Sequence, residues 1–156
     1  MSKKTAFILL LISIPIFVLY SKMGEASKSN PRNATVVTMP DALSVEEKVN
    51  KHRISLNINK LEHDKVLCDF AQKRVDRMVG VDWVATPHPF MEEDHRNSPV
   101  SDRLISENVG SGFNEDVVME GWLNSKGHRE AIENKGYTKT CVATNKSLIV
   151  QIFAEK

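Results

Sequence analysis

The stretch LIVQIFA, Leu148–Ala154, decides the fold. Gln151 is its single polar residue, so an extended backbone here would present apolar side chains on both alternating faces. This pattern predicts a central strand covered on two sides. A β-rich run at residues 138–144 precedes it, and Asn145-Lys146-Ser147 between the two runs indicates a hairpin.

Helices upstream are expected to supply the two covers. Ser44 is a predicted N-cap for a first helix over about 45–55, and Asp64 caps a second helix that Gly80 ends. Asn114 caps a third helix. Their buried sides are marked by apolar residues at helical spacing, namely Val45 and Val49, then Leu67, Ala71, Val75 and Met78, then Val117, Val118, Gly121 and Trp122. The expected helices come first along the chain and the antiparallel strand pair comes last. This order predicts an α+β domain over residues 44–156, with helices on both faces of a small sheet.

Between the second and third helices the periodic pattern fails. Residues 81–106 contain Pro87, Pro89 and Pro99, together with charges at 92–94, so a long irregular connection is expected. Connections of this length inside a small domain are functional or disordered.

The N-terminal part is not expected to belong to the domain. A short basic start is followed by an apolar run at residues 6–20, which is too short for a comfortable membrane span and suits a secretory signal. Gly24 and Ala26 place small residues where a signal peptidase reads, so residues 1–26 are predicted to be a signal peptide. An uncleaved membrane anchor is the alternative. Residues 27–43 are predicted to form a flexible leader.

Composition excludes some partners. The chain of 156 residues is 41% apolar and 26% charged, and residues 27–156 hold 18 basic and 19 acidic side chains. This balance does not suggest a nucleic-acid partner. In an oxidising compartment Cys68 and Cys141 would either pair or stay as two separately buried thiols. Asn33 and Asn145 begin glycosylation sequons.

A few residues stand out as candidates for chemistry. His52, His63 and His95 lie among charged or polar neighbours and are expected to be solvated, whereas His88 lies between two prolines. His128 follows Gly127, which is interpreted as a glycine stop after Trp122. Glu107, in SENVG, precedes a loop that contains Gly110 and Gly112. No HExxH, GxSxG, P-loop or dinucleotide motif is present, and both cysteines lie inside expected elements, which disfavours a cysteine nucleophile.

The order of these pieces resembles the CAP superfamily, which includes cysteine-rich secretory, antigen-five and pathogenesis-related proteins. The similarity extends over roughly residues 44–156 and is carried by INKLEHDKVLCDFAQKRVDRM, SENVG, VVMEGWLNSKGHREAI, GYTKT and VQIFA. It is closest to the microbial single-domain branch. The resemblance implies an α-β-α sandwich with a small central antiparallel sheet.

The resemblance also implies a shallow cavity in which two histidines and two glutamates can hold a divalent metal. Glu107 matches the glutamate of the family's GEN motif, His128 matches the histidine after the tryptophan helix, and His88 matches the upstream histidine, with His95 as the alternative. Ser125 stands where a second glutamate is found in the animal and plant branch. His88, Glu107 and His128 would still form a three-ligand zinc set. Alternatively, Glu107 and His128 only pin loops to the sheet.

The family offers three functions. The first is a secreted, non-catalytic module that binds a sterol, a fatty acid or another lipid, with Trp83, Val84 and Phe90 as possible apolar contacts. The second is an extracellular protein that acts through a protein partner. The third is a metal-dependent hydrolase or peptidase that uses His88, Glu107 and His128, with zinc activating water.

Overall fold

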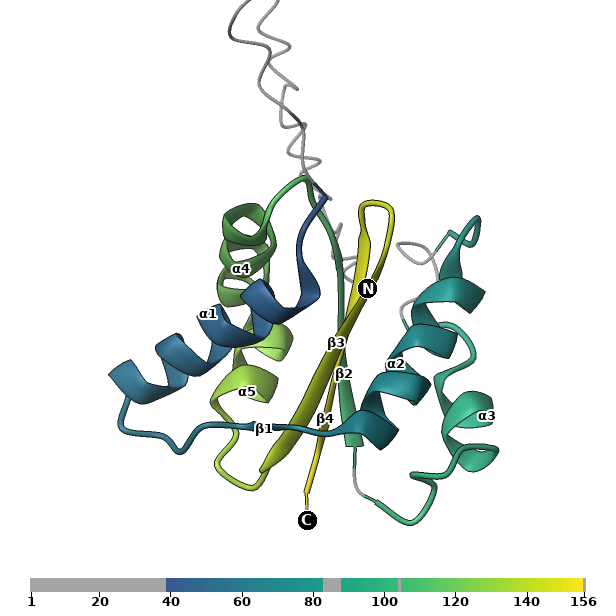
Figure 1. The fold of residues 1–156 in the computed structure, drawn as a ribbon, viewed down its shortest axis with the longest axis horizontal. Coiled ribbons are helices and arrows are strands. Elements are labelled where there is room, and N and C mark those ends of the chain that lie inside the picture. Colours follow the sequence, from purple (N-terminus) through teal and green to yellow (C-terminus); the bar gives the residue numbers. More distant parts are fainter. Residues whose placement is uncertain (1–38, 83–87, 104, 156) are drawn as a thin grey trace, which may run out of the picture. The chain divides into compact units, whose positions relative to one another are not determined.

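The computed structural model describes residues 39–82, 88–103 and 105–155. A four-stranded sheet in the order β1-β3-β4-β2 lies between two layers of helices (Figure 1). Strand β4 pairs antiparallel with both of its neighbours, and all seven of its residues are buried. The predicted central strand and hairpin are therefore confirmed. The strands are β1 Glu62–His63, β2 Ile105–Ser111, β3 Lys139–Asn145 and β4 Leu148–Ala154.

The sheet is mixed rather than wholly antiparallel. The two residues of β1 pair parallel with β3, through bonds from Glu62 N–H to the Thr138 carbonyl and from Asp64 N–H to the Thr140 carbonyl. Two residues are too few to carry an alternation signal, so β1 could not be expected from the pattern.

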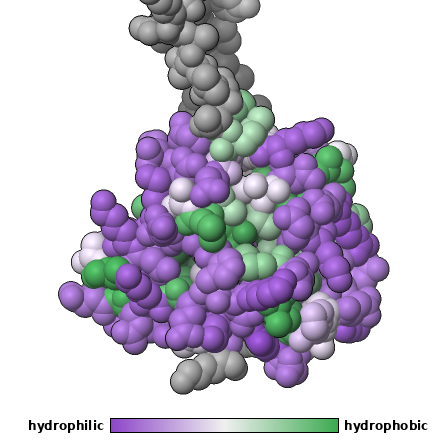
Figure 2. All heavy atoms as spheres, viewed as in Figure 1, coloured by the Kyte–Doolittle hydropathy of each residue, from purple (hydrophilic) through white to green (hydrophobic). Residues whose placement is uncertain are grey.

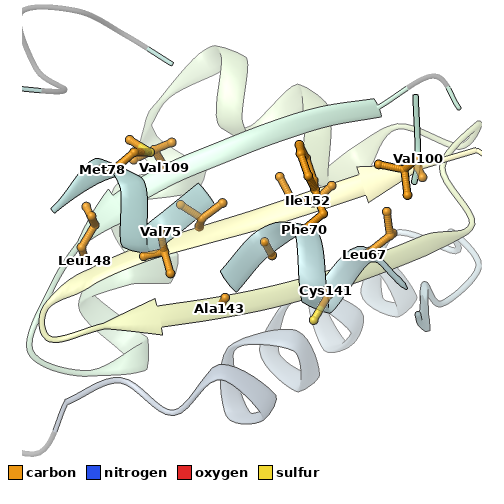
Figure 3. Packing of buried hydrophobic residues seen from close by; sticks show 13 residues of the cluster. Leu67, Phe70, Val75, Met78, Val100, Val109, Cys141, Ala143, Leu148 and Ile152 are labelled. Atoms are coloured by element: carbon orange, nitrogen blue, oxygen red, sulfur yellow. The ribbon is translucent and has the colours of Figure 1, made fainter. Parts of the chain in front are cut away.

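Helices cover both faces of the sheet, as expected for an α-β-α sandwich. Alternation along β4 sends Val150 and Ile152 into the core beneath one layer (Figure 3) and Ile149 and Phe153 into the core beneath the other. Trp122 lies in the second core. The first layer consists of α2 Lys65–Met78 and the short α3 Met91–Arg96, and the second of α1 Ala42–Ser55, α4 Glu115–Asn124 and α5 Lys126–Glu133.

Helix α1 begins earlier than predicted. Asp41, not Ser44, is its N-cap, and the Asp41 carboxylate accepts the Ser44 backbone N–H at 2.8 Å. Ala42 and Leu43 are therefore helical, although they were assigned to the flexible leader. Both residues are good N-caps, so sequence preference alone did not distinguish Asp41 from Ser44. Asp64 and Asn114 cap α2 and α4 as predicted.

Two corrections concern the segment between α2 and α4. Residues 81–106 are not entirely irregular, because they contain α3 and the first two residues of β2. SENVG is a strand rather than the approach to a loop, since every residue of β2 has a partner in β4. Its polar residues and glycine hid the strand signal, and the pairing with β4 overrides that weak propensity.

Gly127 is not a helix stop. Helix α4 ends at Asn124, and Ser125, with an extended backbone (φ −90°, ψ 123°), separates it from α5. The Ser125 N–H still bonds to the Gly121 and Trp122 carbonyls, and its own carbonyl accepts the Arg129 N–H that starts the next helix. Gly127 lies within α5. The stretch WLNSKGHRE is therefore a junction between two helices.

Cys68 of α2 and Cys141 of β3 form a disulfide, with Cα atoms 5.0 Å apart. This resolves the question that the sequence left open. The predicted signal peptide, residues 27–38 of the leader and the sequon at Asn33 lie outside the described residues, while Asn145 ends β3. Within the described ranges, none of the helices has the length and apolarity that a membrane crossing requires.

Candidate functional site

Glu107 lies at the centre of the candidate site. Strand β2 places it on the sheet face toward α2, and both carboxylate oxygens accept hydrogen bonds from Arg74 of that helix. The distances are 2.7 Å from Nε to Oε2 and 2.8 Å from Nη2 to Oε1. Both side chains are almost completely buried. A two-pronged guanidinium–carboxylate pair of this kind fixes the geometry of both groups.

The surroundings set the charge of Glu107. Burial alone raises the pKa of its carboxyl, but hydrogen bonds from His88 and Arg74 and the positive charge of Arg74 outweigh burial and bring the pKa below its ordinary value. Glu107 is therefore a stable carboxylate and a weak proton acceptor.

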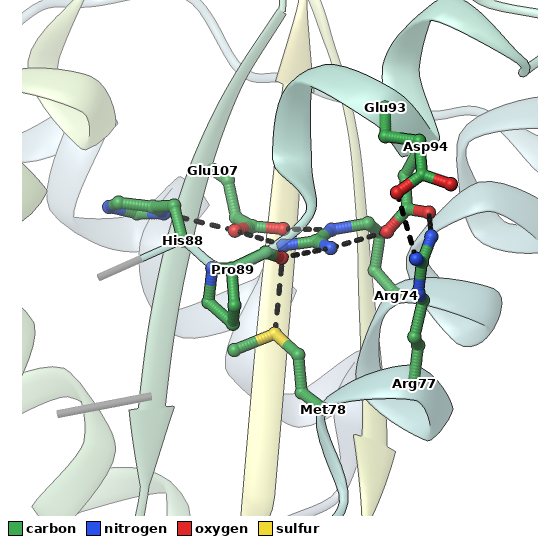
Figure 4. Close-up of polar contacts among 8 residues, drawn as sticks. All are labelled: Arg74, Arg77, Met78, His88, Pro89, Glu93, Asp94 and Glu107. Atoms are coloured by element: carbon green, nitrogen blue, oxygen red, sulfur yellow. Dashed lines mark hydrogen bonds and ion pairs between the residues drawn. The ribbon is translucent and has the colours of Figure 1, made fainter. Parts of the chain in front are cut away.

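Arg74 also joins this carboxylate to the segment that follows α2. Its Nη1 donates to the Pro89 carbonyl at 2.8 Å and to Asp94 at 2.5 Å (Figure 4). Arg77, one turn further along α2, pairs with Asp94 and with Glu93. Arg74 was not among the site residues predicted from the sequence. Its position was a signal, because it falls on the same helical face as Leu67, Ala71 and Met78.

His88 contacts the same carboxylate. Its Nδ1 lies 2.9 Å from Glu107 Oε1, and 41% of its side chain remains exposed. His88 and Phe90 both have left-handed backbones, with φ of 52° and 63°. Such conformations are uncommon for residues other than glycine and persist where surrounding contacts hold them. The Arg74 bond to the Pro89 carbonyl and the Arg77 guanidinium, 4.2 Å from the centre of the Phe90 ring, supply those contacts.

His128 approaches the site from α5. Asn108, next to Glu107 on β2 but facing the other side, donates to the His128 carbonyl at 3.1 Å. The ring Nδ1 of His128 is buried and has no hydrogen-bond partner among the described residues. Burial, and then repulsion from nearby His88, lower the pKa of His128. The contact to Glu107 is thus made by His88, while His128 stays near His88 as a neutral imidazole.

The other candidates lie elsewhere. His95 in α3 bonds to the Val100 carbonyl at 2.9 Å, so its ring holds the turn after α3 rather than the site. His52 bonds to Glu133, and His63 to Glu46, each at 2.9 Å. These two histidines were expected to be free in solvent, but both have carboxylate partners because α1 brings each pair together across the fold.

Comparison with known proteins identifies the family of this chain. Residues 46–148 match the cysteine-rich secretory protein family, which is well over half of the chain. The chain belongs to the CAP family. A curated relative, described as the uncharacterized membrane protein YlbC of Bacillus subtilis (strain 168), is 25% identical over 111 residues. That alignment covers 69% of this chain and 32% of the relative.

Solved CAP structures confirm the fold. An extracellular protein containing an SCP domain from Bacillus anthracis str. Ames matches with a TM-score of 0.66 and 23% identity, over 74% of this chain and 40% of that one. An outer surface protein from Borrelia burgdorferi matches with a TM-score of 0.61 and 23% identity, over 73% of this chain and 91% of that one. A cysteine-rich secretory protein from Staphylococcus aureus subsp. aureus Mu50 matches with a TM-score of 0.60 and 20% identity. The match covers 74% of this chain and 38% of that one. The chain thus spans about a third of the curated relative and two fifths of the first of these structures.

Two features of the described residues oppose metal binding by the CAP metal set. Both oxygens of Glu107 are already bonded to Arg74, whose charge opposes a second cation beside the same carboxylate. Ser125, at the place of the second glutamate, lies at the α4–α5 junction. Among the described residues, the one group with three donor atoms within 4.8 Å of one another is His63, Cys68 and Cys141, whose sulfurs are bonded to each other. As arranged, His88, Glu107 and His128 do not fit a divalent metal.

A hollow of about 540 Å³ opens beside His88. Its apolar lining comes from Pro89, Phe90 and Met91, and Arg96 adds a cation. Glu92 and Glu93 complete it. On the face of the molecule shown in Figure 2, the described surface is mainly hydrophilic, with apolar residues in small separated patches. Because the hollow combines this apolar lining with the partly exposed imidazole of His88, it can contact an amphipathic molecule.

Proposed function

We propose that this CAP domain is a secreted, non-catalytic binding module that takes a sterol, a fatty acid or another lipid in the hollow beside His88. The polar end of the ligand bonds to the exposed edge of the His88 ring, or to Arg96 if it is a carboxylate. The apolar part lies against Phe90 and Met91.

The observation that carries this proposal is the turn His88-Pro89-Phe90. Two left-handed residues hold an imidazole and a phenyl ring at the edge of the hollow, and Phe90 is 43% exposed. An exposed aromatic ring on a strained but firmly bonded turn is a feature of ligand clamps. Arg74 supports the turn from within the domain through the Pro89 carbonyl.

The metal-dependent hydrolase or peptidase is not favoured. Such a reaction needs Glu107 either as a free metal ligand or as a proton acceptor. Its pKa is lowered and its oxygens are held by Arg74, so it is suited to neither role.

Export is part of the proposal. The apolar run at residues 6–20 supports a secretory signal or an anchor. Two of the similar structures are described as an extracellular protein and an outer surface protein, whereas the curated relative is described as a membrane protein.

A lipid-binding assay with a matched pair of variants tests the site. Purified protein is titrated with labelled sterol and labelled fatty acid, and saturable binding is expected for one of them. Phe90→Ala should weaken this binding about tenfold or more, because burial of one phenyl ring contributes about 1.5–3 kcal/mol. Phe113→Ala is the control, since Phe113 is 63% exposed and precedes α4, outside the lining of the hollow.

Two results would count against the proposal. Lack of saturable uptake of either lipid class removes the lipid ligand. Equal loss with Phe113→Ala moves binding away from the hollow. If lipid uptake is absent but a protein from the native surroundings is captured by the wild type and not by Phe90→Ala, the same turn serves an extracellular protein partner instead.

A further inference from the structure

The disulfide has an acid–base neighbour that a purely structural crosslink does not need. His63 of β1 lies with its Nε2 3.2 Å from Cys68 Sγ. The donor atoms of His63, Cys68 and Cys141 all lie within 4.8 Å of one another. The imidazole is therefore in hydrogen-bond range of Cys68 Sγ, and Cys141 Sγ lies within 4.8 Å of it.

Glu46 of α1 fixes the orientation of that imidazole. Its Oε2 lies 2.9 Å from His63 Nδ1, and its Oε1 accepts the Val142 backbone N–H at 2.7 Å. Because a carboxylate can only accept, Nδ1 must carry the proton in this contact. In the neutral ring Nε2 then faces the disulfide with its lone pair, and in the imidazolium it faces the disulfide with a proton.

We propose that Cys68–Cys141 is a thiol–disulfide exchange site, in which a low-molecular-weight thiol attacks Cys68 and His63, oriented by Glu46, supplies the proton to the departing sulfur. The assignment rests on the sulfur–imidazole–carboxylate series and on the unequal exposure of the two sulfurs. It is independent of the lipid site.

Exposure selects the sulfur that is attacked. Cys141 is 2% exposed, whereas Cys68 is only partly buried in the first turns of α2. The His63 side chain, which contacts Cys68, is itself 50% exposed. Of the two cysteines, Cys68 is therefore the more accessible to an incoming thiolate.

The first step replaces the bond between Cys68 and Cys141 by a bond between Cys68 and the incoming thiol. The thiolate attacks Cys68 Sγ, a bond forms between the two sulfurs, and the bond to Cys141 breaks with its electron pair on Cys141 Sγ. A thiolate buried in apolar surroundings is unfavourable, so the reaction needs a proton at that sulfur. The His63 imidazolium provides it, and the products are a mixed disulfide at Cys68, a Cys141 thiol and a neutral His63.

The second step releases Cys68. Another low-molecular-weight thiolate attacks the external sulfur of the mixed disulfide and leaves Cys68 as a thiolate, which pairs with His63 once the ring has regained a proton. Two thiolates have then become one small disulfide. The protein has taken up two electrons and one proton from solvent, with Cys141 as a thiol and Cys68 as a thiolate beside the reprotonated His63. Stabilisation of the Cys68 thiolate by the imidazolium favours the reduced form.

The experiment uses the purified full chain and reduced glutathione as the probe. Reaction is stopped by alkylation, and mass spectrometry locates the adduct while the time course gives a second-order rate constant. The adduct is expected on Cys68. An adduct on Cys141, or complete resistance of the folded protein while the urea-unfolded chain reacts, would overturn the proposal.

Variants separate proton transfer from packing. His63→Gln should lower the rate about tenfold or more, because loss of a general acid has an effect of that size or larger. His52→Gln is the matched control, since His52 makes the same kind of carboxylate contact, to Glu133, away from the disulfide. If both variants react within about twofold of the wild type, His63 is not the acid.

The role of Glu46 is tested by a measurement that a loss of packing alone would not change. In a reduced Cys141→Ala background, the ultraviolet absorbance of the Cys68 thiolate should fall when Glu46→Gln or His63→Gln is added. It should not fall with His52→Gln. If Glu46→Gln fails to fold because the Val142 N–H loses its charged partner, the comparison of Cys68 alkylation in folded and urea-unfolded Cys141→Ala protein still decides. Slower alkylation in the folded protein would contradict a stabilised thiolate.

Discussion

Arg74 and Glu107 form an ion pair with two hydrogen bonds, and both side chains are removed from water. The pair connects the helix that covers one face of the sheet to the edge strand of that sheet. It also supports the His88-Pro89-Phe90 turn, since Arg74 reaches the Pro89 carbonyl and Glu107 reaches His88. The shape of the hollow therefore depends on a charge pair below it.

Replacement of Arg74 by methionine should destabilise the domain strongly. The substitution leaves Glu107 buried without its cation, and breaking a buried pair in this way costs about 3–5 kcal/mol. Urea unfolding followed by circular dichroism measures the loss. Addition of Glu107→Gln to Arg74→Met should recover part of it, because the uncompensated charge is then removed.

The surface pair Lys48–Asp116 provides the control for that measurement. Its atoms are 2.7 Å apart, close to the Arg74–Glu107 distance, but both groups are exposed. Asp116→Asn should leave the urea midpoint nearly unchanged, because exposed ion pairs add little to stability. A large effect of Asp116→Asn together with a small effect of Arg74→Met would contradict the ranking by burial.

Stability should fall in two stages as the pH is lowered. The pKa of His128 is lowered in the folded protein, so the unfolded chain binds this proton more readily. The stability associated with His128 is therefore complete above its ordinary pKa of 6.5 and declines as the pH falls below that value. The pKa of Glu107 is also lowered, and its contribution declines later, below its ordinary value of 4.5.

Urea midpoints measured across this pH range would reveal both stages. His128→Gln should flatten the first stage and leave the second, because glutamine does not titrate. An unchanged slope in that variant would show that other groups cause the loss of stability near pH 6.5.

Two glycines should respond to alanine with opposite signs. A Cβ at Gly110 would lie 2.9 Å from Trp122 Nε1, the atom that donates to the Val109 carbonyl, so Gly110→Ala should cost about 1–3 kcal/mol. A Cβ at Gly127 would meet nothing within 4 Å. Because Gly127 lies inside α5, Gly127→Ala should stabilise the domain by about 0.4–1 kcal/mol. Thermal unfolding of the two variants checks the signs, and destabilisation by Gly127→Ala would favour a helix stop after all.

The disulfide should contribute substantially to stability. It joins positions 73 residues apart, and closure of a loop of this length in the unfolded chain corresponds to about 4 kcal/mol. The double variant Cys68→Ala, Cys141→Ala should lose stability of this order in urea unfolding, compared with the oxidised wild type. Equal stability of the two proteins would mean that the unfolded chain is already compact around these residues.

The elements with clear periodicity were predictable. Helix α2 followed from its apolar spacing and Asp64 cap, and β4 followed from apolar residues on both alternating faces, with Gln151 as the single break. The two-residue β1 and the polar β2 lacked such a signal, since both are held by pairing with neighbours that are distant in sequence. The Gly127 prediction failed because Ser125 ended α4 first.

The candidate site was only partly predictable. The family resemblance selected His88, Glu107 and His128; the structure brings His88 into contact with Glu107 and leaves His128 nearby. It could not supply Arg74, although a cation on the apolar face of α2 indicated a buried acidic partner. Arg53 of α1 is a second buried cation on an apolar helix face, one turn after Val49. It donates to the Asn59, Ile132, Asn134 and Tyr137 carbonyls.

Strand β4 separates its two neighbours in space but follows both of them along the chain. Until Leu148–Ala154 has been synthesised, β2 and β3 have no common partner, and the strand that contributes to both apolar cores between them is missing. The four-stranded sheet therefore cannot be completed before β4 has been synthesised. If the chain is exported, the two sides of the domain can therefore join only after β4 has paired with β2 and β3.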